Sequence, residues 1–185
     1  MATQVAAQDA AVHRFSVEDV VAMYAAGILD DDIRRELVDG VLIDMNPPGP
    51  RHAFVVQRLN RHFVIGVEDR YDVRVQDAVL TPDAGWRSPD LMVLAQGGGD
   101  RLPDTALLIV EVASTSRARD LGKATAYAAC GVTEYWVVDI DRDDVLVHRE
   151  PHNGAYEVLE RFVPGDVITA LIDLPPVDVS SLLGR

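Results

Sequence analysis

The chain has 185 residues, of which 48% are apolar and 25% charged, and this composition is typical of a globular protein rather than a disordered or fibrous one. Its single cysteine, Cys130, excludes an intramolecular disulfide and a cysteine-cluster zinc site, and no apolar run of about 18 residues predicts a transmembrane helix. With 17 basic and 30 acidic residues the net charge is −13, which disfavours a protein that binds nucleic acids over its whole surface.

The length predicts one domain, because globular domains average about 150 residues. We expect this domain to span residues 16–185 and the Ala- and Gln-containing residues 1–15 to form a flexible N-terminal arm. The first residues lack a basic segment followed by an apolar core, so we expect no secretory signal. A cytoplasmic protein that makes no membrane contact is the expectation that follows.

The domain is predicted to begin with a helix and a hairpin. Ser16, with an acid three residues later, is typical of a helix N-cap, and Gly27 is typical of the residue that ends a helix. Asp39-Gly40 is a strong hairpin signal, and it separates strand-like runs at residues 35–38 and 41–45.

A second helix is predicted at residues 51–65, because Pro50 occupies its first turn and follows the chain-breaking Asn46–Gly49. Its apolar stripe begins at His52 and continues through Val56, Leu59 and Phe63. A second strip, along the flank of this stripe, consists of Arg51, Arg58 and His62.

The second half of the domain is predicted to be rich in strands. The strand-like stretches are residues 72–79, 91–95, 106–112, 134–140, 145–149 and 155–160, with a helix at 119–129 that Gly131 ends. The run at 106–112 is apolar except for Glu111, as expected for a central strand that is covered on both faces. After residue 163 the chain is predicted to form short extended pieces. The pattern indicates a mixed central β-sheet flanked by helices, of class α/β or α+β.

Three residues of the predicted elements are candidates for a catalytic or metal-binding role. Asp90 follows Pro89 at the mouth of a strand, and Glu111 lies in the most apolar strand, where an ionised carboxylate is costly. Lys123, 12 residues later, is the only lysine in a chain that otherwise uses 16 arginines. This single lysine indicates a place where a compact ammonium is needed rather than a planar guanidinium.

Helix geometry brings these groups toward one another. Asp120, Lys123 and Tyr127 fall within about 60° around the predicted helix, so they share a face that turns toward the strand of Glu111. Two carboxylates from neighbouring strands suit Mg²⁺ or Mn²⁺, which lowers the pKa of a bound water and stabilises charge on a phosphoryl oxygen. Metal-assisted hydrolysis of a phosphodiester is the reaction that these groups favour.

The sequence resembles the Uma family of restriction endonucleases, which belongs to the PD-(D/E)XK nuclease superfamily. The resemblance covers about residues 16–165. It rests on Glu36-Leu37-Val38-Asp39-Gly40, Pro50-Arg51-His52, Pro89-Asp90, Glu111-Val112 with Ser114, Asp120, Lys123, Tyr127, Gly131 and Glu134-Tyr135-Trp136-Val137-Val138-Asp139.

This resemblance implies a restriction-endonuclease-like fold that binds a divalent metal at the edge of the sheet. Carried over by position, Asp90 and Glu111 would be the metal-binding acids, Lys123 the catalytic lysine and Glu36 an additional catalytic acid. The chain departs from the superfamily pattern because Ala113 stands two residues after Glu111, where the lysine usually stands. The resemblance therefore implies a lysine that acts from the following helix.

Each residue also has a structural interpretation. Asp90 could serve as a turn residue, Glu111 could form a buried pair with an arginine, and Lys123 could be a solvated helix residue. Glu36 could pair with Arg34 or Arg35, and His52 is better explained as a core residue at the start of its helix. Tyr127 could orient Lys123 or only pack.

The charge distribution limits where DNA could bind. Residues 46–131 hold ten acids and ten bases, whereas both ends of the chain carry an excess of acids. Within this neutral segment the strip of Arg51, Arg58 and His62 is the best candidate for contacts with phosphates. We expect a Mg²⁺-dependent DNA endonuclease that forms a homodimer through apolar sheet edges and exposed aromatic residues. The alternatives are a catalytically inactive nuclease-like module for nucleic-acid binding or dimerisation, and a small-molecule phosphoesterase.

Overall fold

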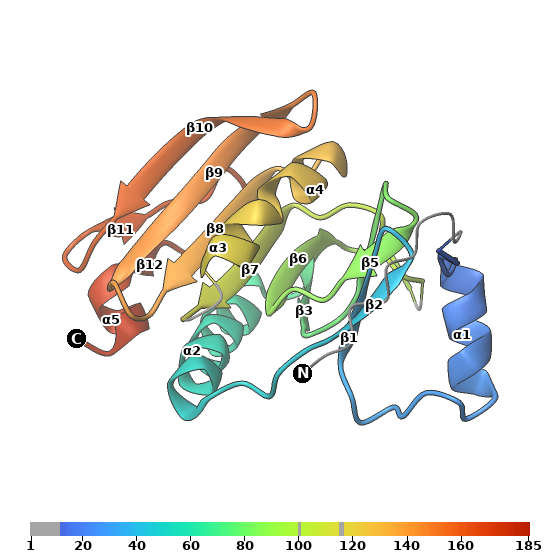
Figure 1. Cartoon of the computed structure of the whole chain (residues 1–185). Helices are drawn as coiled ribbons and strands as arrows, with labels where there is room; N and C mark the ends of the chain where they lie inside the picture. The colour runs from blue at the N-terminus through green and yellow to red at the C-terminus, as the bar shows by residue number, and fades with distance from the viewer. Residues whose placement is uncertain (1–11, 100, 115–116) are drawn as a thin grey trace.

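The computed structural model describes residues 12–99, 101–114 and 117–185 (Figure 1). Its centre is a six-stranded sheet with the order β10-β9-β8-β7-β6-β3. Only β7 and β8 run parallel, so this sheet is mixed. The strands are β3 (Tyr71–Val75), β6 (Leu91–Ala95), β7 (Leu108–Ala113), β8 (Glu134–Asp139), β9 (Asp144–His152) and β10 (Ala155–Phe162).

Two smaller sheets complete the fold. A four-stranded sheet has the order β2-β1-β5-β4, and a two-stranded sheet pairs β11 with β12. Their strands are β1 (Arg35–Val38), β2 (Val41–Asp44), β4 (Val79–Thr81), β5 (Gly85–Arg87), β11 (Val167–Ile168) and β12 (Val177–Asp178). Helix α1 (Val17–Ala25) begins with a capping box between Ser16 and Asp19 and buries Val20 in a cluster with Leu37 and Trp86 of the four-stranded sheet.

Helices cover both faces of the six-stranded sheet, as Figure 1 shows. On one face, α2 (Pro50–Val67) and α5 (Val179–Leu183) pack against alternate sheet residues such as Val110 and Trp136. On the other face, α3 (Arg117–Gly122) and α4 (Ala124–Ala129) lie over the opposite alternation, which includes Ile109. All six residues of β7 are buried as a result, and this is why its sequence is almost continuously apolar.

The predicted mixed sheet flanked by helices is confirmed, but the structure divides two predicted elements and adds others. The predicted strand at 72–79 is divided, because Gln76 has a positive φ and β4 joins the other sheet. The predicted helix at 119–129 is two short helices that meet at Lys123. The sequence reading also missed the β4–β5 hairpin and placed extended chain where α5 forms.

The predicted flexible arm, residues 1–15, lies largely outside the described residues. Of its last residues, Phe15 donates its backbone N–H to Gly40 O at 2.9 Å and so joins the β1–β2 turn. In the described part of the chain, none of the helices combines the length and the apolar character that a bilayer span requires.

Candidate active site

Asp90 and Glu111 meet through the pairing of β6 with β7. Leu91 lies opposite Val110 in this antiparallel ladder, so Asp90 and Glu111 come one step further along it, as neighbours across the two strands. Asp90 Oδ2 accepts a hydrogen bond from the backbone N–H of Val112 at 2.9 Å. The carboxylate of Asp90 is thus held by the same strand that carries Glu111.

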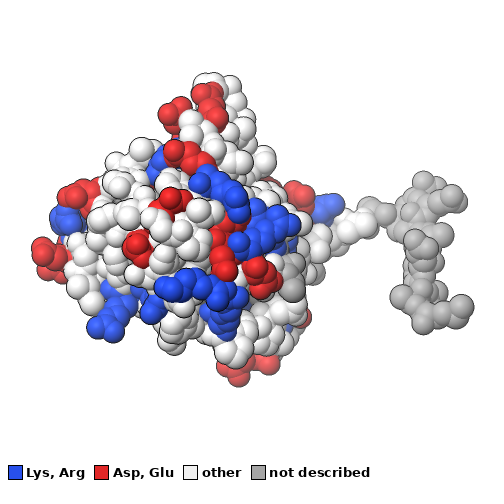
Figure 2. Space-filling view, turned by 90° about the vertical axis from the view of Figure 1, so that its left-hand side faces the viewer, with Lys and Arg blue, Asp and Glu red and all other residues white. Residues whose placement is uncertain are grey.

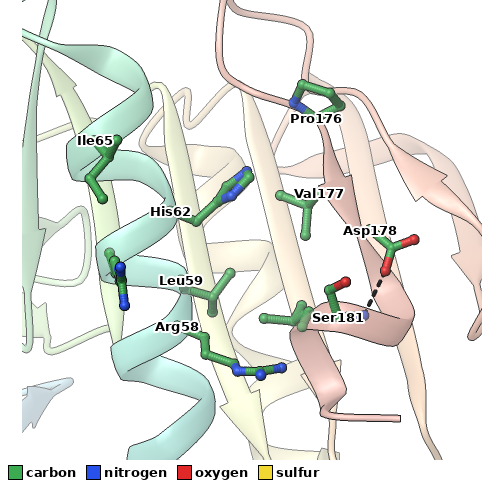
Figure 3. A pocket seen from close by; sticks show the side chains of 10 residues that line it. Arg58, Leu59, His62, Ile65, Pro176, Val177, Asp178 and Ser181 are labelled. Carbon is green, nitrogen blue, oxygen red and sulfur yellow. Dashed lines mark hydrogen bonds between the residues drawn. The ribbon is translucent and has the colours of Figure 1, made fainter.

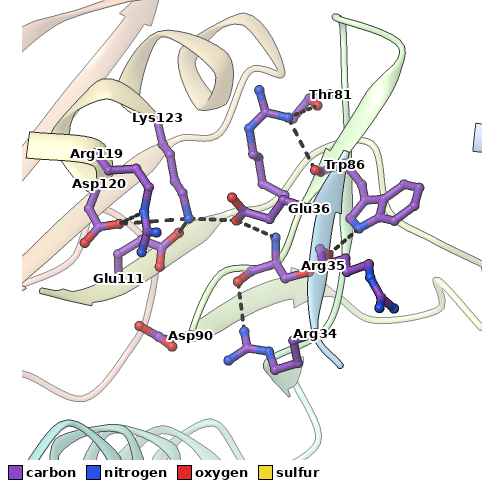
Figure 4. Close-up of polar contacts among 12 residues, drawn as sticks. Arg34, Arg35, Glu36, Thr81, Trp86, Asp90, Glu111, Arg119, Asp120 and Lys123 are labelled. Carbon is purple, nitrogen blue, oxygen red and sulfur yellow. Dashed lines mark hydrogen bonds and ion pairs between the residues drawn. The ribbon is translucent and has the colours of Figure 1, made fainter. Parts of the chain in front are cut away.

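Lys123 joins this pair of strands to the four-stranded sheet. Its Nζ donates to Glu111 Oε1 at 2.8 Å and to Glu36 Oε1 at 2.7 Å (Figure 4). The helix break leaves the expected helical face intact, because Lys123 N still bonds to the carbonyls of Arg119 and Asp120 one turn earlier. The structure therefore brings Glu36, Glu111 and Lys123 into direct contact, although 87 positions separate Glu36 from Lys123.

Further hydrogen bonds fix both glutamates. Tyr127 donates its hydroxyl to Glu111 Oε1 at 2.9 Å, and the backbone N–H of Ser88 donates to Glu36 Oε1 at 3.1 Å. The side chains of Glu36, Glu111 and Lys123 are only 3%, 5% and 5% exposed. This ion-pair cluster is therefore a buried feature and not a solvated surface pair.

A small polar cavity of about 130 Å³ borders both Asp90 and Glu111. It is also lined by Arg34, His52 and Asp120, together with the loop at residues 45–49 that precedes α2. His52 Nε2 lies 2.9 Å from Asp90 Oδ2, and it donates this hydrogen bond because a carboxylate only accepts. We call this space the acidic cavity.

Burial and neighbouring charges shift the pKa values of this cluster in opposite directions. Burial raises the pKa of Glu111 to about 7; Lys123 opposes this rise, and the charges of Asp90 and Asp120 add to it. Burial alone would lower the pKa of Lys123, but Glu111 and Glu36 raise it above its ordinary value. The ammonium is therefore charged at neutral pH, and Glu111 sits in a region with an excess of negative charge.

Comparison with known proteins identifies the family of the chain. The chain matches the model of the Uma2 family, described as "Putative restriction endonuclease", over residues 17–179. The protein belongs to the Uma2 family. Its fold is similar to that of a solved structure described as a "putative nuclease belonging to DUF820" from Anabaena variabilis ATCC 29413. That match has a TM-score of 0.78 and 14% sequence identity, and it covers 92% of this chain and 98% of the other. Among curated proteins, none has a significantly similar sequence.

A divalent metal in this Uma2 protein needs carboxylates that face one common space. Within the described residues, no three or more His, Cys, Asp or Glu side chains are grouped so that they could hold a metal ion together. Mg²⁺, however, keeps several waters and commonly takes one or two carboxylates from the protein. Asp90 and Glu111 supply two such groups on one cavity, and the raised pKa of Glu111 marks a position where a cation would offset buried negative charge. The donor set therefore fits Mg²⁺ or Mn²⁺.

The predicted phosphate-contacting strip lies along α2, away from the walls of the acidic cavity. Arg51 pairs with Asp143 at 2.9 Å, and the guanidinium of Arg58 lies 4.6 Å from the centre of the Phe54 ring. His62 Nε2 lies 3.3 Å from the carbonyl oxygen of Pro175. None of the three strip residues lines the cavity that holds the acids.

Sequence reasoning missed two cavity residues and misjudged a third. Arg34 and Arg119 line the acidic cavity, and His52 lies there as the hydrogen-bond partner of Asp90 instead of in the apolar core. The alternation of side chains along a strand is a signal that could have found Arg34, because it places residues 34 and 36 on one face. Arg34 therefore faces the acidic cavity, whereas the neighbouring Arg35 does not line it.

Proposed function

We propose that this Uma2 protein is a divalent-metal-dependent endonuclease that hydrolyses phosphodiester bonds of DNA. The observation that carries the proposal is the buried contact of Lys123 with Glu36 and Glu111, beside a cavity that Asp90 and Glu111 share. Membership in the Uma2 family and the nuclease-like fold support a nuclease function.

Asp90 and Glu111 would hold Mg²⁺ or Mn²⁺, which lowers the pKa of a bound water and stabilises charge on a phosphoryl oxygen. The ammonium of Lys123 would orient the attacking water or stabilise the negative charge that develops around phosphorus. Glu36 and Tyr127 would act as positioning residues. Glu36 accepts a hydrogen bond from Lys123 Nζ, and Tyr127 donates one to Glu111 Oε1.

The DNA backbone would follow α2 away from the acidic cavity. Arg58 and His62 line a separate groove of about 510 Å³ between α2 and the chain at residues 176–182 (Figure 3). Arg51 and His62 lie 11 positions apart, or about 16 Å along the helix. This strip therefore starts beside His52 at the acidic cavity and ends in the groove.

The surface charge supports localised rather than general contact with DNA. On the face that Figure 2 presents, basic side chains gather near the middle with acidic side chains among them. Arg51 illustrates this mixture, because Asp143 would have to release it before it could bind a phosphate. We therefore expect weak binding without metal and a strong dependence on salt.

Cleavage assays with plasmid, duplex and single-stranded DNA test the proposal. We expect products with Mg²⁺ or Mn²⁺, none with excess chelator, and none from Lys123→Ala that circular dichroism shows to be folded. Arg70→Ala is the control, because Arg70 is exposed, lies outside the acidic cavity and has an exposed acid as its ion-pair partner. Cleavage by the folded Lys123→Ala variant in excess chelator would rule out this mechanism.

A second candidate is a nuclease-like module without turnover. It is favoured by the fact that Lys123 already supplies a cation to both glutamates it contacts, and by the net charge of −13. Calorimetric titration with Mn²⁺ separates the two functions. A folded protein that takes up no Mn²⁺ and cleaves no DNA would be such a module.

The expected homodimer remains a prediction. The edge strand β10 exposes Leu159, which is 59% accessible, and it is one of two sheet edges along which a second copy could pair. Light scattering of the full chain tests this prediction, and a monomeric mass at all concentrations would contradict it.

A further inference from the structure

Two buried side-chain atoms in the described parts of the chain have no hydrogen-bond partner, and both lie at the acidic cavity. They are Arg34 Nε and His52 Nδ1. Buried polar atoms are almost always satisfied, so these two atoms require hydrogen-bond partners inside the cavity, from water or from a bound ligand. The cavity is polar, which agrees with such a ligand.

The guanidinium of Arg34 is held in place through Nη2, whereas its Nε has no hydrogen-bond partner. Its Nη2 donates to the carbonyl oxygen of Ser88 at 3.1 Å, which fixes the guanidinium beside Asp90 (Figure 4). Among the described residues Arg34 forms no ion pair within 4.0 Å, although three carboxylates line the same cavity. A fixed guanidinium with a free donor is suited to an incoming anion.

A second guanidinium and a helix end lie on other walls of the cavity. Arg119 reaches it from α3 with a side chain that is 48% exposed, and its Nε is 3.7 Å from Asp120 Oδ1. The 18-residue helix α2 begins there at Pro50, and its N-cap Gly49 supplies no side-chain hydrogen bond to the first turn. Its N-terminal N–H groups and dipole favour an anion at this end.

We propose that Arg34, Arg119 and the first turn of α2 form a phosphate subsite that holds a backbone phosphate of the substrate beside Asp90 and Glu111. This inference rests on the proposed function and names its phosphate-binding residues. Arginine matches the geometry of phosphate oxygens better than lysine does, because its planar fork donates two parallel hydrogen bonds. A cavity of about 130 Å³ is small compared with sites for whole drug-sized ligands, so it admits a phosphate group rather than a nucleoside. The subsite therefore reads the DNA backbone and not the bases.

Calorimetric titration of the full chain with inorganic phosphate, with and without Mg²⁺, tests the subsite. We expect Arg34→Gln to weaken phosphate binding by about tenfold or more, because it removes charge-assisted hydrogen bonds. Arg34→Lys should retain part of the affinity, and Arg70→Gln, a charge change at an exposed pair, should leave it unchanged. Thermal unfolding confirms that each variant is folded.

The outcomes distinguish this inference from the proposed function. If the wild type binds no phosphate, or if Arg34→Gln and Arg70→Gln bind it equally well, the subsite is wrong even where DNA is cleaved. If Arg34→Gln alone weakens phosphate binding in a protein that cleaves no DNA, the subsite stands and the nuclease proposal fails. In an active protein, we expect Arg34→Gln to raise KM for DNA, whereas Arg70→Gln should not.

Discussion

Replacing Lys123 by methionine removes a buried ammonium while keeping an unbranched side chain of similar length. Two carboxylates then lose their partner, and both have side chains that are no more than 5% exposed. Breaking a buried ion pair by removing one member costs about 3–5 kcal/mol, whereas an exposed pair costs about 0–1 kcal/mol. Because domains are stable by only about 5–15 kcal/mol, we expect Lys123→Met to remain folded but with a greatly reduced free energy of unfolding.

The loss in free energy of unfolding of Lys123→Met should depend on pH, because Glu111 titrates in the accessible range. A buried carboxyl whose folded-state pKa is above the unfolded value destabilises the protein as pH rises through that interval. For Glu111 the interval runs from 4.5 to about 7 in the wild type, and loss of the ammonium extends it upward. We therefore expect Lys123→Met to be most destabilised at pH 8 and close to the wild type at pH 4.5.

Urea unfolding of the wild type and the variant at these two pH values measures the effect. Arg70→Met is the control for loss of an exposed pair, and we expect it to change the free energy of unfolding by less than about 1 kcal/mol. Adding Glu36→Gln and Glu111→Gln to Lys123→Met should restore much of the stability, since the cluster then carries no charge. A loss no larger than that of Arg70→Met at pH 8 would refute the reasoning.

Three further predictions concern other parts of the molecule. Gly85→Ala should lower the melting temperature, because its Cβ would lie 1.9 Å from Leu37 O, whereas Gly122→Ala meets nothing within 4 Å and should be tolerated. Burial lowers the pKa of His148 below 6.5, so the wild type should lose stability as pH falls below 6.5. In His148→Gln, the urea concentration at the unfolding midpoint should change less with pH. Asp90→Asn should weaken Mn²⁺ binding in calorimetry without unfolding the protein, and unchanged affinity would remove Asp90 from the metal site.

The central strands and the β1–β2 hairpin were predictable because the buried strands are apolar and the hairpin turn carries a strong signal. The run at 106–112 identifies the buried central strand, and Asp39-Gly40 identifies the hairpin. The short hairpin of β4 and β5 was missed because three-residue strands carry too little pattern, and their pairing with β1 depends on contacts distant in sequence. Helix α5 was missed for a related reason, since five residues have little helical propensity without the packing against α2 that buries Leu182.

The residues of the candidate site were predictable where a residue type is rare in its context, and not where the residue type is frequent in the chain. A single lysine and a glutamate within an apolar strand attract attention, and the structure places them 2.8 Å apart. Arginines are frequent in this chain, so residue type alone does not distinguish Arg34 from Arg35, and only the alternation along the strand places Arg34 on the side of Glu36. The partner of His52 was equally hidden, because it lies 38 positions further along the chain.

The contact between Glu36 and Lys123 has a consequence for when the buried cluster forms during synthesis. Because the two residues are 87 positions apart, a ribosome must release most of the polypeptide before the pair can form. C-terminal truncations that stop before Lys123 therefore leave Glu36 and Glu111 without their shared cation. The buried cluster is complete only after residue 123 has left the ribosome and the two distant segments have folded together.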